Sequence, residues 1–494
     1  MNYRSTRDTA KTPAYVSSAE AIKRGLAPDG GLYMPEKLPS LESSEINSLI
    51  EMSYDERAAY ILSKFLTDYD KDALAADCKA AYSEERFEGG AAPLRHIDTS
   101  LYSLELWHGP TCAFKDMALQ IMPRLLSRAL TMTGERRLAR ILVATSGDTG
   151  KAALEGYRDV DGVDITVFYP VDGVSRMQKM QMTTQEGGNV NVCAVRGNFD
   201  DAQNGVKAIF SDAECARRAE EKGMFFSSAN SINWGRLAPQ IVYYVSAYCD
   251  LIADGKIKNG DKINVCVPTG NFGNIFAAFI ARRMGLPIAK FICASNSNCV
   301  LTDFIRTGEY DRTREFFKTM SPSMDILISS NLERLIYMMS DAETTAGLMN
   351  ELKVNGKYRV SDALHAEITS LFAGYCLNES ETAGVIKDTL ERDGYLIDPH
   401  TAVGLGCARK YIAETGDDTV TVVASTASPY KFAGDVCRSI GTEIPSDEPA
   451  DILKALSNAT GTDIPKPLAR TLTLPVRFDK TADPADMPSV ALGK

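Results

Sequence analysis

The chain has 494 residues, of which 44% are hydrophobic and 24% are charged, so a small disulfide-stapled module, a fibrous chain and a disordered chain are all excluded. Its 54 Lys and Arg against 65 Asp and Glu give a net charge of −11, without long runs of one sign. Because binding to nucleic acid needs clustered basic residues, we expect no nucleic-acid partner.

The cysteine and histidine content limits the compartment and the chemistry. The eleven cysteines form no CxxC pair, which indicates a reducing compartment, and none of the four histidines has zinc-site spacing, so we expect no metal. The N-terminal segment lacks the apolar core of a signal peptide, and no apolar run approaches the roughly 20 residues that span a bilayer. We therefore expect a cytoplasmic protein without a membrane partner.

The order of sequence patterns predicts four parts. Turn signals mixed with helical patterns predict an N-terminal region over 1–95. Short apolar strands that enter small-residue loops and then helices predict two parallel-sheet α/β parts, at 96–245 and at 246–440, the second with a mostly helical segment. Seven of the 21 prolines lie in the last 54 residues, which predicts an extended C-terminal arm over 441–494.

Lys115 is the first candidate for chemistry. It lies at the start of an amphipathic helix in HGPTCAFKDMALQ, after an apolar Ala-Phe pair. Burial of its stem and the positive end of the helix dipole both disfavour the charged amine. A lysine with a lowered pKa is the nucleophile that Schiff-base chemistry needs. On spacing alone, a surface lysine beside Asp116 is the alternative.

The loop TGNFGN at 269–274 stands between a predicted strand and a helix. Its glycines let the backbone approach closely, and its amides with the helix dipole form an anion cradle. No GK[ST] follows, and the next strand ends without a carboxylate, so a lone phosphate fits better than a dinucleotide. A tight turn with packing glycines is the alternative.

Four further segments carry polar groups at strand ends or helix starts. SGDTG at 146–150 is suited to a carboxylate or a cofactor ring substituent, and STAS at 425–428 to a neutral heteroatom. In NSINWGR, Asn and Arg donors suit a phosphate or carboxylate, while a helix cap plus a surface Arg is the alternative. His400 in DPHTAVG has either a structural or an active-site role.

Together these segments resemble a known family. Seven of them occur in one order across about residues 4–440: LAPDGGLYMPE, ELWHGPTCAFKDMALQ, ATSGDTGKAAL, NSINWGR, PTGNFGN, SSNLERL and DPHTAVG. They resemble the threonine synthases of the longer bacterial and fungal type, in the fold type II class of pyridoxal-phosphate (PLP) enzymes. The resemblance implies PLP as the cofactor and two parallel-sheet α/β domains with an N-terminal region and helical additions.

The resemblance also implies roles for individual residues. Lys115 binds PLP covalently and Thr426 faces the pyridine nitrogen. The cofactor phosphate is held by Gly270, Asn271, Phe272, Gly273 and Asn274. The ring and the substrate carboxylate lie near Ser146, Asp148 and Thr149, and the substrate phosphate near Asn230, Ser231 and Arg236. Two positions depart from the family: Cys299, where an acidic residue is frequent, and Ser428, where a histidine is frequent.

The implied reaction converts O-phospho-L-homoserine and water to L-threonine and phosphate by γ-elimination and β-addition, the last step of threonine biosynthesis. Lys115 moves the α-proton, and Arg236 stabilises the departing phosphate. Two alternatives remain: another fold type II PLP enzyme, such as a threonine dehydratase or a cysteine synthase, and a non-catalytic relative that binds a phosphorylated metabolite. We expect a monomer or a homodimer, and no activation by S-adenosylmethionine.

Overall fold

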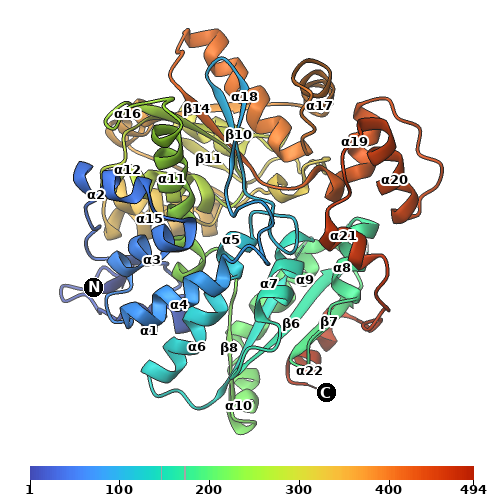
Figure 1. Cartoon of the computed structure of the whole chain (residues 1–494). Coiled ribbons are helices and arrows are strands. Elements are labelled where there is room, and N and C mark those ends of the chain that lie inside the picture. Colours follow the sequence, from blue (N-terminus) through green and yellow to red (C-terminus); the bar gives the residue numbers. More distant parts are fainter. Residues whose placement is uncertain (146, 172–173, 494) are drawn as a thin grey trace.

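The computed structural model describes residues 1–145, 147–171 and 174–493, and two large sheets organise them (Figure 1). The larger sheet has the order β13-β10-β9-β14-β4-β3, with strands Phe372–Cys376, Ile288–Ser295, Ile263–Pro268, Thr421–Ser425, Leu101–Glu105 and Leu94–Asp98. The smaller sheet has the order β15-β7-β6-β5-β8, with strands Thr481–Ala482, Val190–Val195, Val163–Pro170, Leu138–Ala144 and Met224–Ser227.

All neighbours in both sheets are parallel except β3 and β4, which are antiparallel. The central strands are buried on both faces: β9 and β14 are buried along their whole length, whereas the edge strand β3 is partly exposed. Continuous apolar strands of this kind need helices on both sides. This confirms the predicted α/β class with two parallel sheets.

Helices cover both sheets. In the larger sheet, α12 (Gly273–Met284) and α18 (Pro399–Thr415) pack against β9 and β10, and α11 (Trp234–Ala253) packs against α12. In the smaller sheet, α7 (Asp148–Tyr157) and α9 (Phe199–Ser211) pack against β5 and β6. The remaining helices between residues 96 and 245 are α5 (Asp116–Leu119), α6 (Met122–Met132), α8 (Arg176–Thr183) and α10 (Ala213–Glu221).

The N-terminal region joins the main core. It contains the antiparallel pair β1 (Tyr3–Ser5) and β2 (Tyr33–Pro35), with helices α1 (Ser18–Arg24), α2 (Ser43–Ile50), α3 (Tyr54–Phe65) and α4 (Lys71–Ala81). The fully buried Trp234 of α11 packs between two aromatic rings of this region, with ring centroids 5.5 Å from Tyr3 and 5.6 Å from Phe65. Residues 1–95 therefore share one hydrophobic core with the larger sheet.

The grouping of strands differs from the predicted division. β4 lies in 96–245, but it pairs with β14 in the larger sheet, because a parallel sheet is completed by strands distant in sequence. The predicted helical segment contains α13 (Val300–Thr307), η1 (Pro322–Met324), α14 (Leu332–Met339), α15 (Ala342–Asn355), α16 (Asp362–Leu371) and α17 (Glu379–Asp393). It also contains the pair β11 (Glu309–Asp311) and β12 (Lys357–Arg359), and β13.

The C-terminal part is more helical than predicted. After η2 (Pro429–Phe432) and α19 (Ala433–Ser439) come α20 (Pro449–Thr460), α21 (Lys466–Thr471), η3 (Pro484–Asp486) and α22 (Met487–Ala491). Each of the last four begins with a proline in its first two positions. Proline is favoured there because its missing N–H would be unpaired anyway, so these prolines start helices instead of extending the chain.

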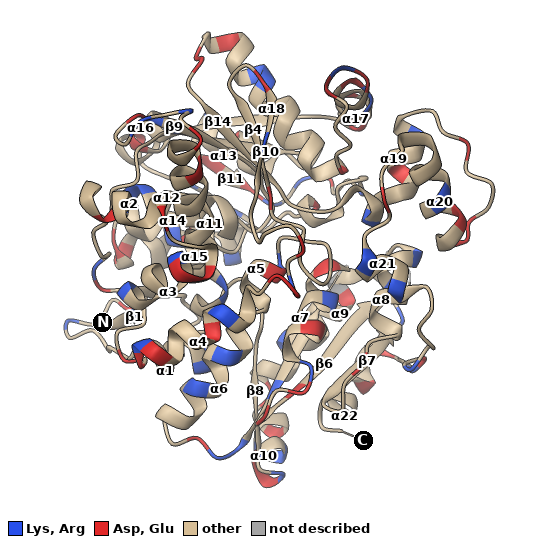
Figure 2. Cartoon of the chain, viewed as in Figure 1, with Lys and Arg blue, Asp and Glu red and all other residues tan. Residues whose placement is uncertain are grey.

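The charged residues are mixed in sign over the helices (Figure 2). Within the described ranges, no helix is long and apolar enough to cross a membrane.

Candidate active site

Lys115 lies in the loop that joins β4 to α5, and this loop is fastened to the end of β14. The backbone N–H of Phe114 donates to the carbonyl of Thr426 at 2.8 Å, and the N–H of Ser428 donates to the carbonyl of Cys112 at 3.0 Å. Cys112 has a left-handed backbone with φ 57°, which is uncommon outside glycine and marks a tightly shaped turn. The predicted STAS loop and the predicted lysine are therefore brought together.

The amine of Lys115 is buried and faces two polar groups. Its Nζ donates to Ser323 Oγ at 3.3 Å and lies 4.0 Å from Asp148 Oδ2. Burial lowers the pKa of Lys115 to about 8, against the pull of the Asp148 carboxylate. The lowered pKa expected from the sequence is thus present, and burial is its main cause. Ser323, in η1, was not singled out by any sequence pattern.

The loop TGNFGN begins α12, with Phe272 in the left-handed conformation at φ 63°. A Cβ on Gly270 would lie 2.5 Å from the backbone oxygen of Ser323, so only glycine permits this close approach. The loop is also held from outside: Ser329 Oγ donates to the carbonyl of Gly270 at 2.7 Å, and Asn331 Nδ2 to that of Asn271 at 2.9 Å.

Asn274 provides a test of whether the loop fits a phosphate group. Its Oδ1 accepts hydrogen bonds from the hydroxyls of Tyr243, at 2.7 Å, and Tyr244. This orientation leaves the buried Nδ2 without a partner among the described residues. An unpaired buried donor is costly unless a ligand accepts from it, so the loop fits an anion at the N-terminus of α12.

Arg236 is the most unusual of the predicted substrate-binding residues. Its side chain lies in the first turn of α11 and is only 3% exposed, yet no described carboxylate pairs with it. One Nη donates to the carbonyl of Ala229 at 2.6 Å, while its buried Nε has no partner among the described residues. Burial lowers the pKa of Arg236 to about 10. A buried cation without a counter-ion favours an anionic ligand.

The other residues of the NSINWGR segment either lie beside the TGNFGN loop or help to begin α11. Asn331 Nδ2 donates to Ser231 Oγ at 3.3 Å, so Ser231 lies beside the TGNFGN loop. Asn230 offers its carbonyl to the N–H of Asn233. Asn233 caps α11, because its Oδ1 accepts from the N–H of Gly235 at 2.9 Å and its Nδ2 donates to the carbonyl of Ile22. Asn233 is therefore structural.

The SGDTG segment leads from β5 into α7. Thr145 Oγ1 accepts from the N–H groups of Gly147 and Gly150, which closes the turn. Asp148 is buried, and Thr149 is half-buried in the first turn of the helix. Ser146, which the resemblance places near the ring, lies outside the described residues. Thr426, directly after β14, is buried, and its carbonyl accepts from the N–H of Phe114 beside Lys115.

His400 connects to the site through Ser323. Its Nε2 accepts a hydrogen bond of 3.1 Å from the N–H of Ser323, so the proton is on Nδ1, which lies 2.6 Å from Asp398 Oδ2. Asp398 also caps α18 by accepting from the N–H groups of His400 and Thr401. Asp398 thus fixes the ring of His400, and His400 in turn holds Ser323 beside Lys115.

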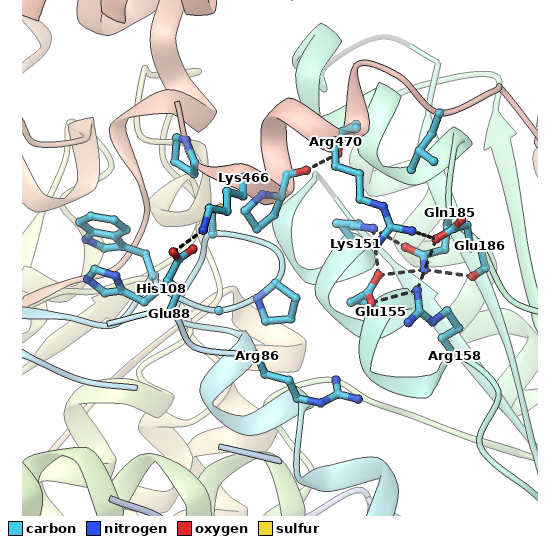
Figure 3. Close-up of a pocket in the computed structure, with 18 of the residues that line it drawn as sticks. Arg86, Glu88, His108, Lys151, Glu155, Arg158, Gln185, Glu186, Lys466 and Arg470 are labelled. Atoms are coloured by element: carbon cyan, nitrogen blue, oxygen red, sulfur yellow. Dashed lines mark hydrogen bonds and ion pairs between the residues drawn. The ribbon is translucent and has the colours of Figure 1, made fainter. Parts of the chain in front are cut away.

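A cavity of about 570 Å³ opens beside the loop 107–112, between α7 and the C-terminal helix α21 (Figure 3). Its side chains form ion pairs: Lys151 lies 3.2 Å from Glu155, and Arg470 2.7 Å from Glu186. Lys151 and Arg470 already have carboxylate partners. This cavity is therefore less favourable for an anionic ligand than the surroundings of the buried Arg236. No sequence pattern indicated this cavity, since its walls come from five separated segments.

Comparison with known families first defines the class. Residues 89–426 match the family described as "Pyridoxal-phosphate dependent enzyme", which confirms the class and the cofactor expected from the sequence. Residues 2–82 match "Threonine synthase N terminus", and residues 401–490 match "Threonine synthase, C-terminal". The chain belongs to the threonine synthase family.

Individual relatives agree with this assignment. The chain is 41% identical to human threonine synthase-like 1, covering 85% of this chain but only 58% of that protein. It is 40% identical to the threonine synthase of Pseudomonas aeruginosa, covering 87% and 89%. The crystal structure of the PLP-bound threonine synthase from Brucella melitensis has a TM-score of 0.88 and 36% identity, covering 100% of this chain and 99% of that one.

Proposed function

We propose that the chain is a threonine synthase, which converts O-phospho-L-homoserine and water to L-threonine and phosphate. The observation that carries the proposal is the buried guanidinium of Arg236, which has no carboxylate partner among the described residues. The charge of Arg236 is one of the causes that lower the pKa of Lys115, so a substrate at Lys115 has a cation available for a phosphate group. The threonine synthases among the relatives support this reaction.

The residues of the site fit the cofactor. Lys115 would hold it covalently, the TGNFGN loop with Asn274 would hold its phosphate, and Thr426 would meet the ring nitrogen with a hydroxyl. When bound, PLP supplies an electron sink for the negative charge that develops on the substrate Cα. A hydroxyl neither supplies nor demands a full charge at the ring, unlike an aspartate. Asp148 and Thr149 lie at the start of α7, where helix N–H groups favour the substrate carboxylate.

Proton transfer falls to Lys115. A buried amine whose pKa is about 8 is partly neutral near pH 7 and accepts the proton from Cα. Ser323 Oγ accepts a hydrogen bond from this amine and so fixes its direction. Arg236 would bind the phosphate on Cγ and stabilise the charge as it leaves. The water that adds at Cβ supplies the hydroxyl of threonine, so the atoms balance.

The alternative reactions use substrates without a phosphate group. A threonine dehydratase or a cysteine synthase has no substrate phosphate that a buried arginine such as Arg236 would bind. Because the chain spans 58% of threonine synthase-like 1, that relative's name does not define an activity for this chain. A binding-only role would leave the lowered pKa of Lys115 unused.

Arg236→Met tests the proposal against these alternatives. Losing a charge-assisted contact of about 1.5–3 kcal/mol should raise the KM for O-phosphohomoserine roughly 10- to 100-fold, with PLP still bound. Binding of L-homoserine, which lacks the phosphate, should be unchanged. Arg236→Lys keeps the charge and should recover part of the loss. An unchanged KM in Arg236→Met would place the substrate phosphate elsewhere, and turnover of L-threonine by the parent protein would favour a dehydratase.

A further inference from the structure

Lys431 is a buried lysine that the proposed reaction does not use. It lies in η2, directly after the STAS loop, and its side chain is 0% exposed. Its Nζ lies 2.9 Å from Asp148 Oδ1 and donates to the carbonyl of Thr111 at 2.9 Å. Thr111 in turn donates from its N–H and its hydroxyl to the carboxylate of Asp116. A buried ammonium is tolerated only when paired in this way, so the position of Lys431 is built into the loop that carries Lys115.

The carboxylate of Asp148 stands between two ammonium groups. Its Oδ1 meets Lys431 at 2.9 Å and Gln178 Nε2 at 3.0 Å, while its Oδ2 lies 4.0 Å from Lys115 Nζ. A carboxylate 4 Å from a buried amine favours the protonated amine. Lys431, which is closer to this carboxylate, offsets that attraction.

Four charged groups from four elements act on Lys115. After burial, which lowers the pKa of Lys115, Asp148 of α7 and Asp116 of α5 raise it, while Lys431 of η2 and Arg236 of α11 lower it. For Asp148, burial acts to raise the pKa, but attraction to Lys431 and then to Lys115 outweighs burial and lowers it. Asp148 therefore stays a carboxylate, and Lys431 determines how strongly that carboxylate acts on Lys115.

We propose that Lys431 is a positioning residue that holds the Asp148 carboxylate and so keeps Lys115 available as a neutral amine. This inference rests on the proposed role of Lys115, and it does not depend on which substrate the protein converts.

Competitive labelling of the full-length protein, cleared of PLP, tests the inference without an activity assay. Acetic anhydride reacts with neutral amines, so the labelling of the Lys115 peptide against pH, followed by mass spectrometry, gives the pKa of Lys115. Lys431→Met should raise this pKa by about 1 to 3 units, because Asp148 is then left to Lys115 alone. Asp148→Asn should lower it. The double variant should return it close to the parent value, since both opposing charges are gone.

Two controls separate this effect from a structural one. Lys431→Arg keeps the charge and should leave the titration of Lys115 near the parent. Lys410→Met removes a lysine whose pair with Glu381 is also 2.9 Å long but whose side chain is 39% exposed, and it should change nothing.

The inference would be overturned if the pKa of Lys115 shifted in the same direction in Lys431→Met and Asp148→Asn. An unchanged pKa of Lys115 in either variant would also overturn it. If Lys431→Met does not fold, the inference still requires that Asp148→Asn lower the pKa of Lys115. A protein that shows the predicted shifts but ignores O-phosphohomoserine would contradict the proposed function alone.

Discussion

The Nζ of Lys115 donates a hydrogen bond to Ser323 Oγ at 3.3 Å. Ser323 comes from η1, far along the chain, and its N–H donates to His400 Nε2. Because Asp398 fixes the other ring nitrogen of His400, the three residues form a rigid support behind the lysine. The direction of the Lys115 amine thus depends on residues from segments far apart in the sequence.

Ser323→Ala should lower kcat by up to about tenfold, because it removes one hydrogen bond of roughly 1 kcal/mol from the amine. His400→Ala should lower kcat by about 10- to 100-fold, since it leaves the half-buried N–H of Ser323 without an acceptor. Both variants should retain PLP. The double variant should cost less than the sum of the two, and full additivity in steady-state kinetics would show that His400 acts independently of Ser323.

Asn274→Ala should weaken PLP binding about tenfold or more, because it removes the unpaired Nδ2 and leaves the hydroxyl of Tyr244 without its acceptor, while Tyr243 keeps Gln240 Oε1. Titration of the PLP-free protein, followed by visible absorption, measures the Kd. Tyr244→Phe is the matched control: it leaves Nδ2 in place and should have the smaller effect. Equal Kd values in all three proteins would mean that Asn274 does not contact the cofactor.

Gly270→Ala should destabilise the protein by about 1–3 kcal/mol and impair PLP binding, because the added Cβ would lie 2.5 Å from the backbone oxygen of Ser323. Gly347→Ala, in α15, has no atom within 4 Å of the added Cβ. It should stabilise the protein by about 0.4–1 kcal/mol, since alanine is the better helix former. Thermal unfolding of the two variants should therefore move in opposite directions.

The lowered pKa of Lys115 predicts two pH effects. Capture of PLP should become faster as pH rises towards about 8 and then level off, because the amine must be neutral. Between about pH 8 and the ordinary value of 10.5, the folded state binds fewer protons at Lys115 than the unfolded state. The contribution of Lys115 to the stability of the PLP-free protein should therefore increase with pH in this window. Lys115→Met should abolish both effects, measured by PLP uptake and by urea unfolding.

Much of the architecture could be predicted from local patterns. The strand predicted before the TGNFGN loop is β9, and the loop begins α12 as expected. These features are local, because an apolar strand and a glycine turn are defined by adjacent residues. The prediction of an extended C-terminal arm was wrong because it used only the number of prolines, which disfavours helix. Their positions at helix starts are compatible with helix.

The supporting residues of the site could not be predicted. Ser323 meets Lys115, and Lys431 meets Asp148, across more than 200 residues of sequence. The one signal in the sequence was Lys431 within the apolar stretch PYKFA, where a charged residue needs a buried partner. Single motifs predict the candidate lysine and the candidate phosphate loop, but the electrostatic balance around them depends on long-range packing.

The most direct test of the account is to measure the products formed from O-phosphohomoserine by the purified, PLP-loaded protein. We predict threonine and inorganic phosphate in equal amounts, and no threonine from Lys115→Ala under the same conditions. Release of phosphate without threonine, or an unchanged rate in Lys115→Ala, would contradict the proposed function.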